Sequence, residues 1–282
     1  MGDFEGKIAV ITGAASGIGR AIAHTCAQER MKIVLADIDE KALYNLENEL
    51  ALTGIELLAL TIDVSKKEDI LRLADLTIET FGRVDLLFNN AGVESGSLLW
   101  NTPIEEWEWV LNVNLWGVIH AIRVFIPLML KQPKKCYIIN TASRVGLESG
   151  PGMGSYRISK HALVSLSETL YHELKLVNSN IQVSVLCPGY VQTQLYNSHR
   201  NAPEQVNQNK SNGLIPIESM IERMNMNAMI NGMAPNDIAA AAFEGIRNGD
   251  FYILTDSDSK NSVQQRMDDI LHDRMPTAYL PK

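Results

Sequence analysis

The chain has 282 residues, of which 46% are hydrophobic and 21% are charged, and its formal net charge is -8. This is the composition of an ordinary soluble globular protein with enough apolar side chains for one large core. The negative charge argues against a general nucleic-acid binder, so we expect no nucleic-acid partner. No linker or low-complexity segment divides the chain, and a single domain over residues 1–282 is expected.

The cysteines and histidines give no sign of a metal site. Cys26, Cys136 and Cys187 lack metal-ligand spacing, and the six histidines form no H-E-x-x-H cluster, so we expect no metal. A sparse, odd set of cysteines and a start unlike a signal peptide indicate a cytoplasmic protein. The longest apolar run, 115–130, contains His120, Arg123 and Pro127, which predicts a buried helix rather than a membrane partner.

The first motif is a glycine-rich turn between an apolar run at 7–11, which predicts a buried strand, and a helical pattern. Glycines at such a junction let backbone N–H groups approach phosphate oxygens at the positive end of the helix. We interpret the turn as a cofactor-binding loop, and the alternative is a purely structural turn. The candidate cofactor contacts are Gly13, Ser16, Gly17, Ile18 and Gly19.

A second strand, Ile33–Ala36, ends at Asp37. An acidic residue at this point can accept both ribose hydroxyls of an adenosine. It would repel a 2′-phosphate by roughly 4 kcal/mol at an effective dielectric of 20, and neither Ser16 nor Ile38 is a base that would offset this. We therefore expect NAD(H) to be preferred over NADP(H), with Ile38 beside the adenosine. The alternative is that Asp37 only caps the helix that starts near Asp39.

Helices and strands continue to alternate, which predicts an α/β fold with a doubly wound parallel sheet. Strands are expected at 57–62 and 84–88, and each is followed by small or polar residues. A side-chain amide and small residues at a strand's carboxyl end suit a close approach by adenine and ribose, although an Asn-rich turn would look the same. The further cofactor candidates are Asp63, Val64, Asn90, Ala91 and Gly92.

Residues 103–130 predict one long helix that begins with a proline at its first turn. Asn114 and Gly117 are poor helix formers in the middle of it. Residues that disfavour the local secondary structure are expected at functional sites. We therefore predict a kink in this helix that turns the Asn114 backbone toward a water.

The second half contains the residues with acid–base chemistry. Ser143 follows a strand at 136–140, where open α/β sheets bind ligands, and a glycine-rich loop then leads to Tyr156. Tyr156 and Lys160 lie one turn apart on a predicted helix. A nearby ammonium favours phenolate, so the pair can donate and accept protons near neutral pH. The alternative is a Tyr and a Lys on a solvated helix face.

Together these motifs resemble the short-chain dehydrogenase/reductase family in order and spacing, over roughly residues 6 to 255. The matching pieces are Thr12-Gly13-x-x-x-Gly17-x-Gly19, Asp63-Val64, Asn89-Asn90-Ala91-Gly92, Asn114, Ser143, Tyr156-x-x-x-Lys160 and Pro188-Gly189-x-x-x-Thr193. The resemblance implies a Rossmann-type, three-layer α/β/α fold with about seven strands. It also implies an NAD(P)-dependent oxidoreductase that interconverts a secondary alcohol and a ketone.

The same resemblance implies a role for each catalytic residue. Tyr156 would be the general acid in reduction and the base in oxidation. Lys160 would hold the nicotinamide ribose and lower the pKa of the tyrosine, and Ser143 would donate a hydrogen bond to the substrate oxygen. Asn114 would bind a proton-relaying water through its backbone, and Thr193 would orient the nicotinamide. Further cofactor contacts would be Val113, Thr141, Pro188, Gly189 and Val191.

The segment 194–234 lies where the family has its substrate loop, and it holds five of the eleven methionines. Because Met forms adaptable apolar surfaces, one interpretation is a mobile lid over a bulky apolar small molecule. The alternative is an ordinary helix that packs its apolar face. The candidates to line the substrate pocket are Glu94, Glu148, Ser149, Tyr190, Leu195 and Tyr196.

Residues 256–282 extend beyond the usual family core, and their apolar spacing predicts a terminal helix. Family members often pair as dimers or tetramers, so we expect a homodimer or homotetramer. Our hypothesis is that the extension covers the last strand, near 251–255, and favours the dimer.

Two other functions compete with the alcohol dehydrogenase. One is an NADPH-dependent biosynthetic ketoreductase, which Asp37 disfavours. The other is a non-catalytic dinucleotide-binding regulator, which has no need of all four of the intact residues Asn114, Ser143, Tyr156 and Lys160.

Overall fold

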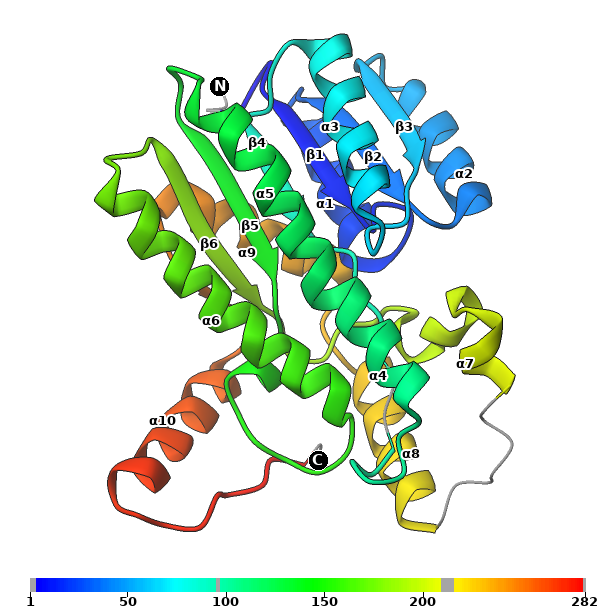
Figure 1. Cartoon of the computed structure of the whole chain (residues 1–282), viewed down its shortest axis with the longest axis vertical. Helices are drawn as coiled ribbons and strands as arrows, with labels where there is room; N and C mark the ends of the chain where they lie inside the picture. The colour runs from blue at the N-terminus through cyan, green and yellow to red at the C-terminus, as the bar shows by residue number, and fades with distance from the viewer. Residues whose placement is uncertain (1–3, 95–96, 209–215, 281–282) are drawn as a thin grey trace.

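The computed structural model describes residues 4–94, 97–208 and 216–280, and its centre is a parallel sheet of seven strands between two layers of helices (Figure 1). The strand order is β3-β2-β1-β4-β5-β6-β7. The strands are β1 (Ile8–Thr12), β2 (Lys32–Asp37), β3 (Leu57–Thr61), β4 (Leu86–Asn89), β5 (Cys136–Thr141), β6 (Ile181–Cys187) and β7 (Tyr252–Leu254). The predicted Rossmann-type α/β/α fold is confirmed.

The helices divide between the two faces of the sheet. One face is covered by α1 (Gly17–Gln28), α2 (Glu40–Ala51) and α9 (Pro235–Asn248). The other is covered by α3 (Lys67–Phe81), α5 (Gly117–Leu130) and α6 (Gly154–Leu176). The remaining helical elements extend from the carboxyl ends of the strands. They are α4 (Ile104–Leu111), η1 (Asn112–Trp116), η2 (Arg144–Gly146), η3 (Leu195–Asn201), α7 (Glu204–Gln208), α8 (Pro216–Ile230) and α10 (Ser257–Leu271).

The central strands are apolar throughout because both of their faces are buried. Along β1, Ile8 and Val10 join the core layer under α3, α5 and α6. Ala9 and Ile11 join the layer under α1, α2 and α9. A parallel sheet with helices on both faces therefore explains why the sequence has continuous apolar runs here instead of alternation.

The long helix expected over 103–130 is interrupted as the sequence indicated. The interruption, Asn112–Trp116, is a π-helical turn between α4 and α5, and π turns of this kind are frequent at functional sites. By length and composition Ile104–Leu130 would also be long enough to cross a membrane. In the fold its inner face packs on the sheet through residues such as Phe125, while Trp116 on its outer face is half exposed.

The segment 194–234 contains η3, α7 and α8, and its residues 209–215 lie outside the described part of the chain. Helix α8 turns Ile221, Asn225 and Met229 inward, whereas Met220 and Met226 are exposed. Helix α8 is thus packed through one face, and the action of the segment as a lid stays a prediction.

Candidate active site

The turn between β1 and α1 is shaped for close contact with a ligand. Gly13 has φ 64°, and a Cβ added there would lie 2.8 Å from the Cα of Ala91. A Cβ at Gly19 would collide with the carbonyl oxygen of Gly13. Ser16, the N-cap of α1, makes no side-chain capping hydrogen bond. The first backbone N–H groups of the helix can therefore donate to phosphate oxygens. The turn therefore fits a dinucleotide pyrophosphate.

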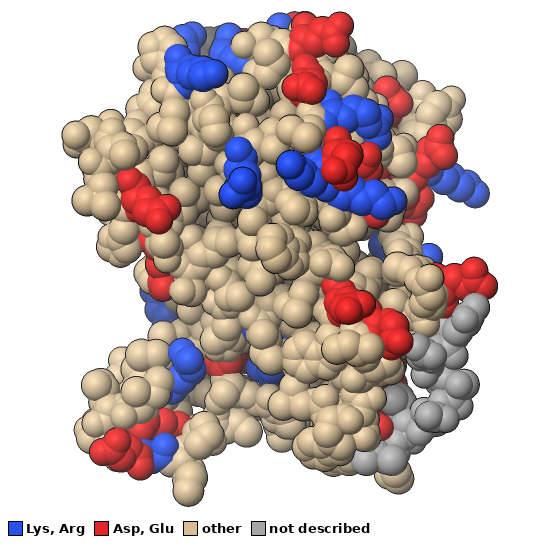
Figure 2. Space-filling model, viewed as in Figure 1, with Lys and Arg blue, Asp and Glu red and all other residues tan. Residues whose placement is uncertain are grey.

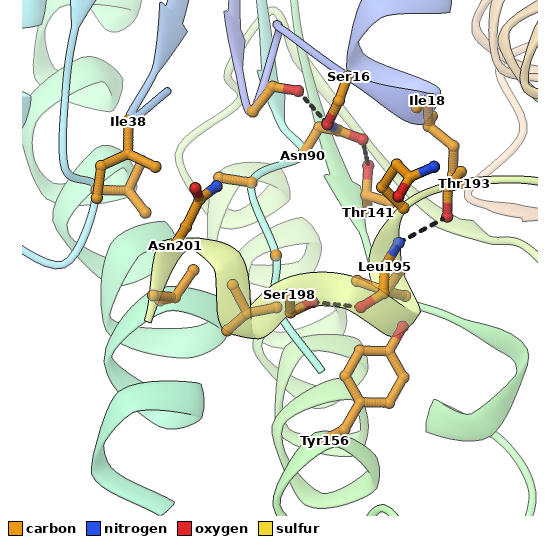
Figure 3. A pocket seen from close by; sticks show the side chains of 18 of the residues that line it. Ser16, Ile18, Ile38, Asn90, Thr141, Tyr156, Thr193, Leu195, Ser198 and Asn201 are labelled. Carbon is orange, nitrogen blue, oxygen red and sulfur yellow. Dashed lines mark hydrogen bonds between the residues drawn. The ribbon is translucent and has the colours of Figure 1, made fainter. Parts of the chain in front are cut away.

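Asn90, which follows β4, fastens this turn to the neighbouring strands. Its Nδ2 donates to the carbonyl oxygens of Thr12 (3.1 Å) and Gly13 (3.3 Å). Thr141 Oγ1 donates to Asn90 Oδ1 at 3.4 Å (Figure 3). The amide predicted to contact the cofactor thus also holds the glycine turn in shape.

Asp37 ends β2 at the same edge of the sheet. Its Oδ2 accepts from the Ala15 N–H at 2.8 Å and its Oδ1 accepts from the Asp39 N–H at 3.0 Å. Burial raises the pKa of Asp37, and these backbone donors oppose the rise. The cap of α2 is Asp39, which accepts from the Ala42 N–H at 3.0 Å. The capping alternative for Asp37 is therefore wrong.

Ser143, Tyr156 and Lys160 come together beyond the carboxyl ends of β5 and β6. The Ser143 hydroxyl lies close enough to the Tyr156 phenol to influence its pKa, and Lys160 Nζ lies 5.5 Å from the centroid of the Tyr156 ring. Lys160 Nζ donates to the carbonyl oxygen of Thr141 at 2.8 Å. A proton donor, a hydrogen-bond donor and an ammonium therefore share one side of the pocket.

The charge balance at Tyr156 differs from the expectation that Lys160 lowers its pKa. Burial raises the pKa of Tyr156, the Glu94 carboxyl adds to the rise, and the nearby Ser143 hydroxyl opposes it. Burial also lowers the pKa of Lys160 to about 8. Arg157 favours the phenolate, but its effect is smaller than that of burial, so the pKa of Tyr156 stays above its ordinary value.

Asn114 is fully buried in the π turn, and its side chain joins three elements. Its Oδ1 accepts from the Val93 N–H at 2.9 Å, and its Nδ2 donates to Val93 O at 2.9 Å and to Ser159 Oγ at 3.0 Å. The loop after β4 and helix α6 are therefore tied to η1. The role predicted for the Asn114 backbone stays a prediction.

One pocket collects nearly all of the predicted cofactor residues, together with Ser143. Gly19 is the exception, since it packs beneath the turn. The predicted residues that line the pocket are Gly13, Ser16, Gly17, Ile18, Asp37, Ile38, Asp63, Val64, Asn90, Ala91, Gly92, Val113, Thr141, Tyr156, Lys160, Pro188, Gly189, Val191 and Thr193.

Most of the pocket wall that η3 contributes was not predicted from the sequence. Leu195, which was expected, lines the pocket together with Ser198 and Asn201, which were not. Figure 3 shows Asn201 extending toward the end of the pocket where Ile38 lies. The short, polar 3₁₀ segment has no hydrophobic period, so no pattern in the sequence pointed to it.

Several substrate candidates do not line this pocket. Ser149 Oγ donates to Thr277 O at 3.0 Å, and Tyr196 is 44% exposed beside a separate hollow next to α1. Tyr190 donates to Asn225 Oδ1 at 3.3 Å, and Glu148 pairs with Arg144. Glu94 also lies outside the pocket wall, although it is close enough to influence Tyr156.

Within the described ranges, no three His, Cys, Asp or Glu side chains gather in a way that would hold a metal ion.

The sequence of residues 7–204 matches the family described as short chain dehydrogenase. The chain therefore belongs to the short-chain dehydrogenase/reductase family of oxidoreductases, as the resemblance implied. A nicotinamide dinucleotide is the cofactor of this class, and the glycine turn at the N-terminus of α1 fits its pyrophosphate.

Three known proteins illustrate the similarity. The CLA biosynthesis dehydrogenase/reductase of Lactiplantibacillus plantarum is 34% identical, over 99% of this chain and 98% of that relative. The 1-deoxy-11-beta-hydroxypentalenate dehydrogenase of Streptomyces exfoliatus is 31% identical, over 94% and 88%. A crystal structure of a short chain dehydrogenase/reductase from Burkholderia phymatum in complex with NAD is 43% identical, covers 99% of each chain and has a TM-score of 0.95.

Proposed function

We propose that the protein is an NAD(H)-dependent dehydrogenase/reductase that interconverts a secondary alcohol and a ketone. The observation that carries the proposal is the joint placement of Ser143, Tyr156 and Lys160 in the pocket that Asp37 also lines. The relatives support the reaction type, since two of them are named as dehydrogenases. Small molecules are the substrates of this class.

Asp37 supports the preference for NAD(H). It is buried at the end of β2, and its two oxygens already accept backbone N–H groups, so the carboxylate is fixed in place. A 2′-phosphate near 4 Å would be repelled by roughly 4 kcal/mol at an effective dielectric of 20. The structurally similar Burkholderia phymatum protein was crystallised with NAD.

Each residue has a distinct task in the proposed reaction. When bound, the nicotinamide ring supplies or accepts the hydride. Tyr156 gives its proton to the substrate oxygen in reduction and takes one from the alcohol in oxidation. Ser143 donates a hydrogen bond to that oxygen as negative charge develops on it. Lys160 places a positive charge behind the phenol and, with its pKa near 8, carries that charge at neutral pH.

The surroundings of Tyr156 favour an apolar substrate. Val145 and Met153 pack with its ring in a buried apolar cluster, and Leu195, which packs against this cluster, gives the pocket an apolar wall beside Tyr156. Burying apolar substrate surface against this wall is favourable by roughly 25 cal/mol per Å². We propose a substrate with a secondary hydroxyl or keto group on an aliphatic or cyclic framework.

The test is a panel of aliphatic, cyclic and sterol alcohols, each offered to the purified chain with NAD or with NADP. Absorbance of the reduced cofactor gives the rate. We expect turnover with NAD, and the NADPH-dependent ketoreductase alternative predicts the opposite cofactor order. No turnover of any alcohol or ketone with either cofactor would refute the dehydrogenase and favour the regulator.

Tyr156→Phe tests the mechanism with a minimal change. Loss of general acid–base catalysis should lower kcat by about 100-fold or more, while NAD affinity stays within about twofold because the ring still packs in place. Lys135→Met, remote from the pocket, serves as the control. A rate within a few-fold of the parent chain would show that another group moves the proton.

We also propose a cytoplasmic homo-oligomer. The three cysteines are buried and free, which suits a reducing compartment. Large apolar side chains are exposed on the helices of one face, among them Ile104, Trp116 and Ile158. Figure 2 shows few charged side chains across the middle of this face, which suits pairing with a second copy.

A further inference from the structure

The chain after α10 turns back toward the body of the protein instead of continuing outward (Figure 1). Asp273 has φ 52°, and the Arg274 N–H returns to Asp269 O at 2.8 Å. The Asp269 carboxylate then accepts from the Thr277 N–H at 2.9 Å and pairs with Arg274 at 3.4 Å. Asp269 is 4% exposed, so a buried carboxylate fixes the direction of the segment that follows.

The segment reaches the loop between Ser143 and Tyr156. The Tyr279 N–H donates to Ser149 O at 2.9 Å, and Ser149 Oγ donates to Thr277 O at 3.0 Å. At the neighbouring Gly150 there is room only for hydrogen, because a Cβ would lie 2.6 Å from Tyr279 O. The backbone of the loop and the backbone of the C-terminal segment therefore pair directly.

A second connection joins the base of the same loop to the start of α10. Arg144 pairs with Glu148 at 3.3 Å within the loop and approaches Asp256 at 3.8 Å. Asp256 is the N-cap of α10, where it accepts from the Ser259 N–H at 2.7 Å. Both ends of the extension thus hold the loop, one at its base and one at its tip.

The loop in turn contacts the reacting residue. Its Val145 and Met153 pack against the ring of Tyr156. Gly152 accepts from Arg157 Nε at 3.2 Å and lies against Ile221 of α8. A displacement of the loop at Ser149 is therefore passed on to the wall of the substrate site.

We propose that the C-terminal segment 256–280 is a positioning element of the active site in its own chain. It holds the loop 144–154, whose Val145 and Met153 support Leu195 in the pocket wall, so that apolar substrates bind against Leu195. This rests on the proposed function for the identity of the substrate wall. The glycine turn and Asp37 lie apart from the segment, and only Asp256 at its start approaches the cofactor side of the pocket, at Gly189. Removal of the residues after Arg274 should therefore leave cofactor binding intact.

The experiment compares the full chain with a chain that ends at Arg274 and with Gly150→Val, whose side chain would force Tyr279 away. Met275→Ser is the matched control, because Met275 is 88% exposed in the same segment. Hydrogen exchange of loop peptides, NAD affinity and the steady-state constants for the best alcohol are measured. NAD affinity also reports whether each variant is folded.

We expect loop amides to exchange about tenfold faster in the truncated chain and in Gly150→Val, and to be unchanged in Met275→Ser. The alcohol KM should rise about fivefold or more, kcat should change less, and NAD affinity should stay within about twofold. Unchanged loop exchange in the truncated chain overturns the inference, whatever the activity. Altered exchange in a chain that turns over no alcohol supports the loop contact and refutes only the proposed function.

Discussion

At the scale of single residues, burial controls the protonation of the site. Tyr156 is 7% exposed, and desolvation outweighs the charged groups around it in raising its pKa. The pKa of Glu94 is also raised by burial. Burial and the nearby Glu222 raise it from 4.5 to about 7, while Arg157 opposes the rise. Both groups are therefore held in their neutral forms over a wider range of pH than in water.

The raised pKa of Glu94 predicts how stability changes with pH. Between pH 4.5 and about 7 the folded chain binds more protons than the unfolded chain, so this group makes the free energy of unfolding fall as pH rises. Glu94→Gln removes the penalty and should stabilise the protein by about 1 to 2 kcal/mol at pH 8 but not at pH 4.5. Denaturant unfolding at both pH values measures the difference.

Glu79→Gln, an exposed substitution on α3, should change stability little at either pH. A Glu94→Gln chain that is less stable than the parent at pH 8 would mean that the ionised carboxylate has a compensating partner.

Asp37→Asn tests the cofactor preference at a single side chain. The amide keeps one acceptor for the neighbouring backbone but removes the charge that repels a 2′-phosphate. We expect the ratio of kcat/KM for NADP over NAD to rise about 100-fold or more. Asp39→Asn is the control, since it removes an equal charge two residues away, and a similar rise there would assign the effect to net charge alone.

The catalytic side chains could be predicted from the sequence because their identity and spacing carry the chemistry. What could not be predicted was which neighbours surround them. Glu94 acts on Tyr156 across a gap of more than sixty positions in the chain, and no local pattern records such a contact. Ser149 is polar and lies close to Tyr156 in sequence, yet its hydroxyl donates a hydrogen bond to the carbonyl oxygen of Thr277 instead of facing the pocket.

At the scale of elements, the π turn η1 shows how an irregular helix is stabilised. The Asn114 side chain satisfies both backbone groups of Val93 and contacts α6 through Ser159. A poor helix former in the middle of a helix was visible in the sequence, but the type of interruption depends on these distant partners.

Asn114→Ala should destabilise the protein by about 2 to 4 kcal/mol, because the three hydrogen bonds of a buried side chain are lost and Val93 keeps unpaired backbone groups. Thermal and denaturant unfolding give the change. Asn112→Ala, at an exposed position in the same turn, should have an effect of less than about 0.5 kcal/mol. Equal effects at the two positions would mean that helix propensity, not the hydrogen bonds, sets the loss.

At the scale of the whole molecule, the order of strands and helices followed from the alternating apolar runs, since a parallel sheet needs a crossover between strands. Elements whose sequences lack a regular hydrophobic repeat were less predictable. Helix α3 and the η3 wall were not anticipated, and the return of the chain from α10 to Ser149 depends on the buried Asp269 rather than on any sequence period.

The apolar face formed by α4, α5 and α6 is the proposed interface of the oligomer, and a substitution on it tests the proposal. Trp116 is 50% exposed in the middle of this helical layer, and a buried charge there would be costly. We expect Trp116→Glu to convert the oligomer to a monomer in sedimentation velocity. Leu52→Glu, at an 89% exposed position after α2, should leave the assembly intact. A parent chain that sediments as a monomer, or a Trp116→Glu chain that still associates, would contradict the proposed interface.

The contact between Tyr279 and Ser149 has a practical consequence for handling the protein. An affinity tag fused after Lys282 would begin three residues from a contact with the active-site loop, whereas Figure 1 places the N-terminus at the opposite end of the molecule. Inhibitor screens and crystallisation trials are therefore better served by an N-terminal fusion, and activities from C-terminally tagged preparations should be compared with those of the cleaved protein.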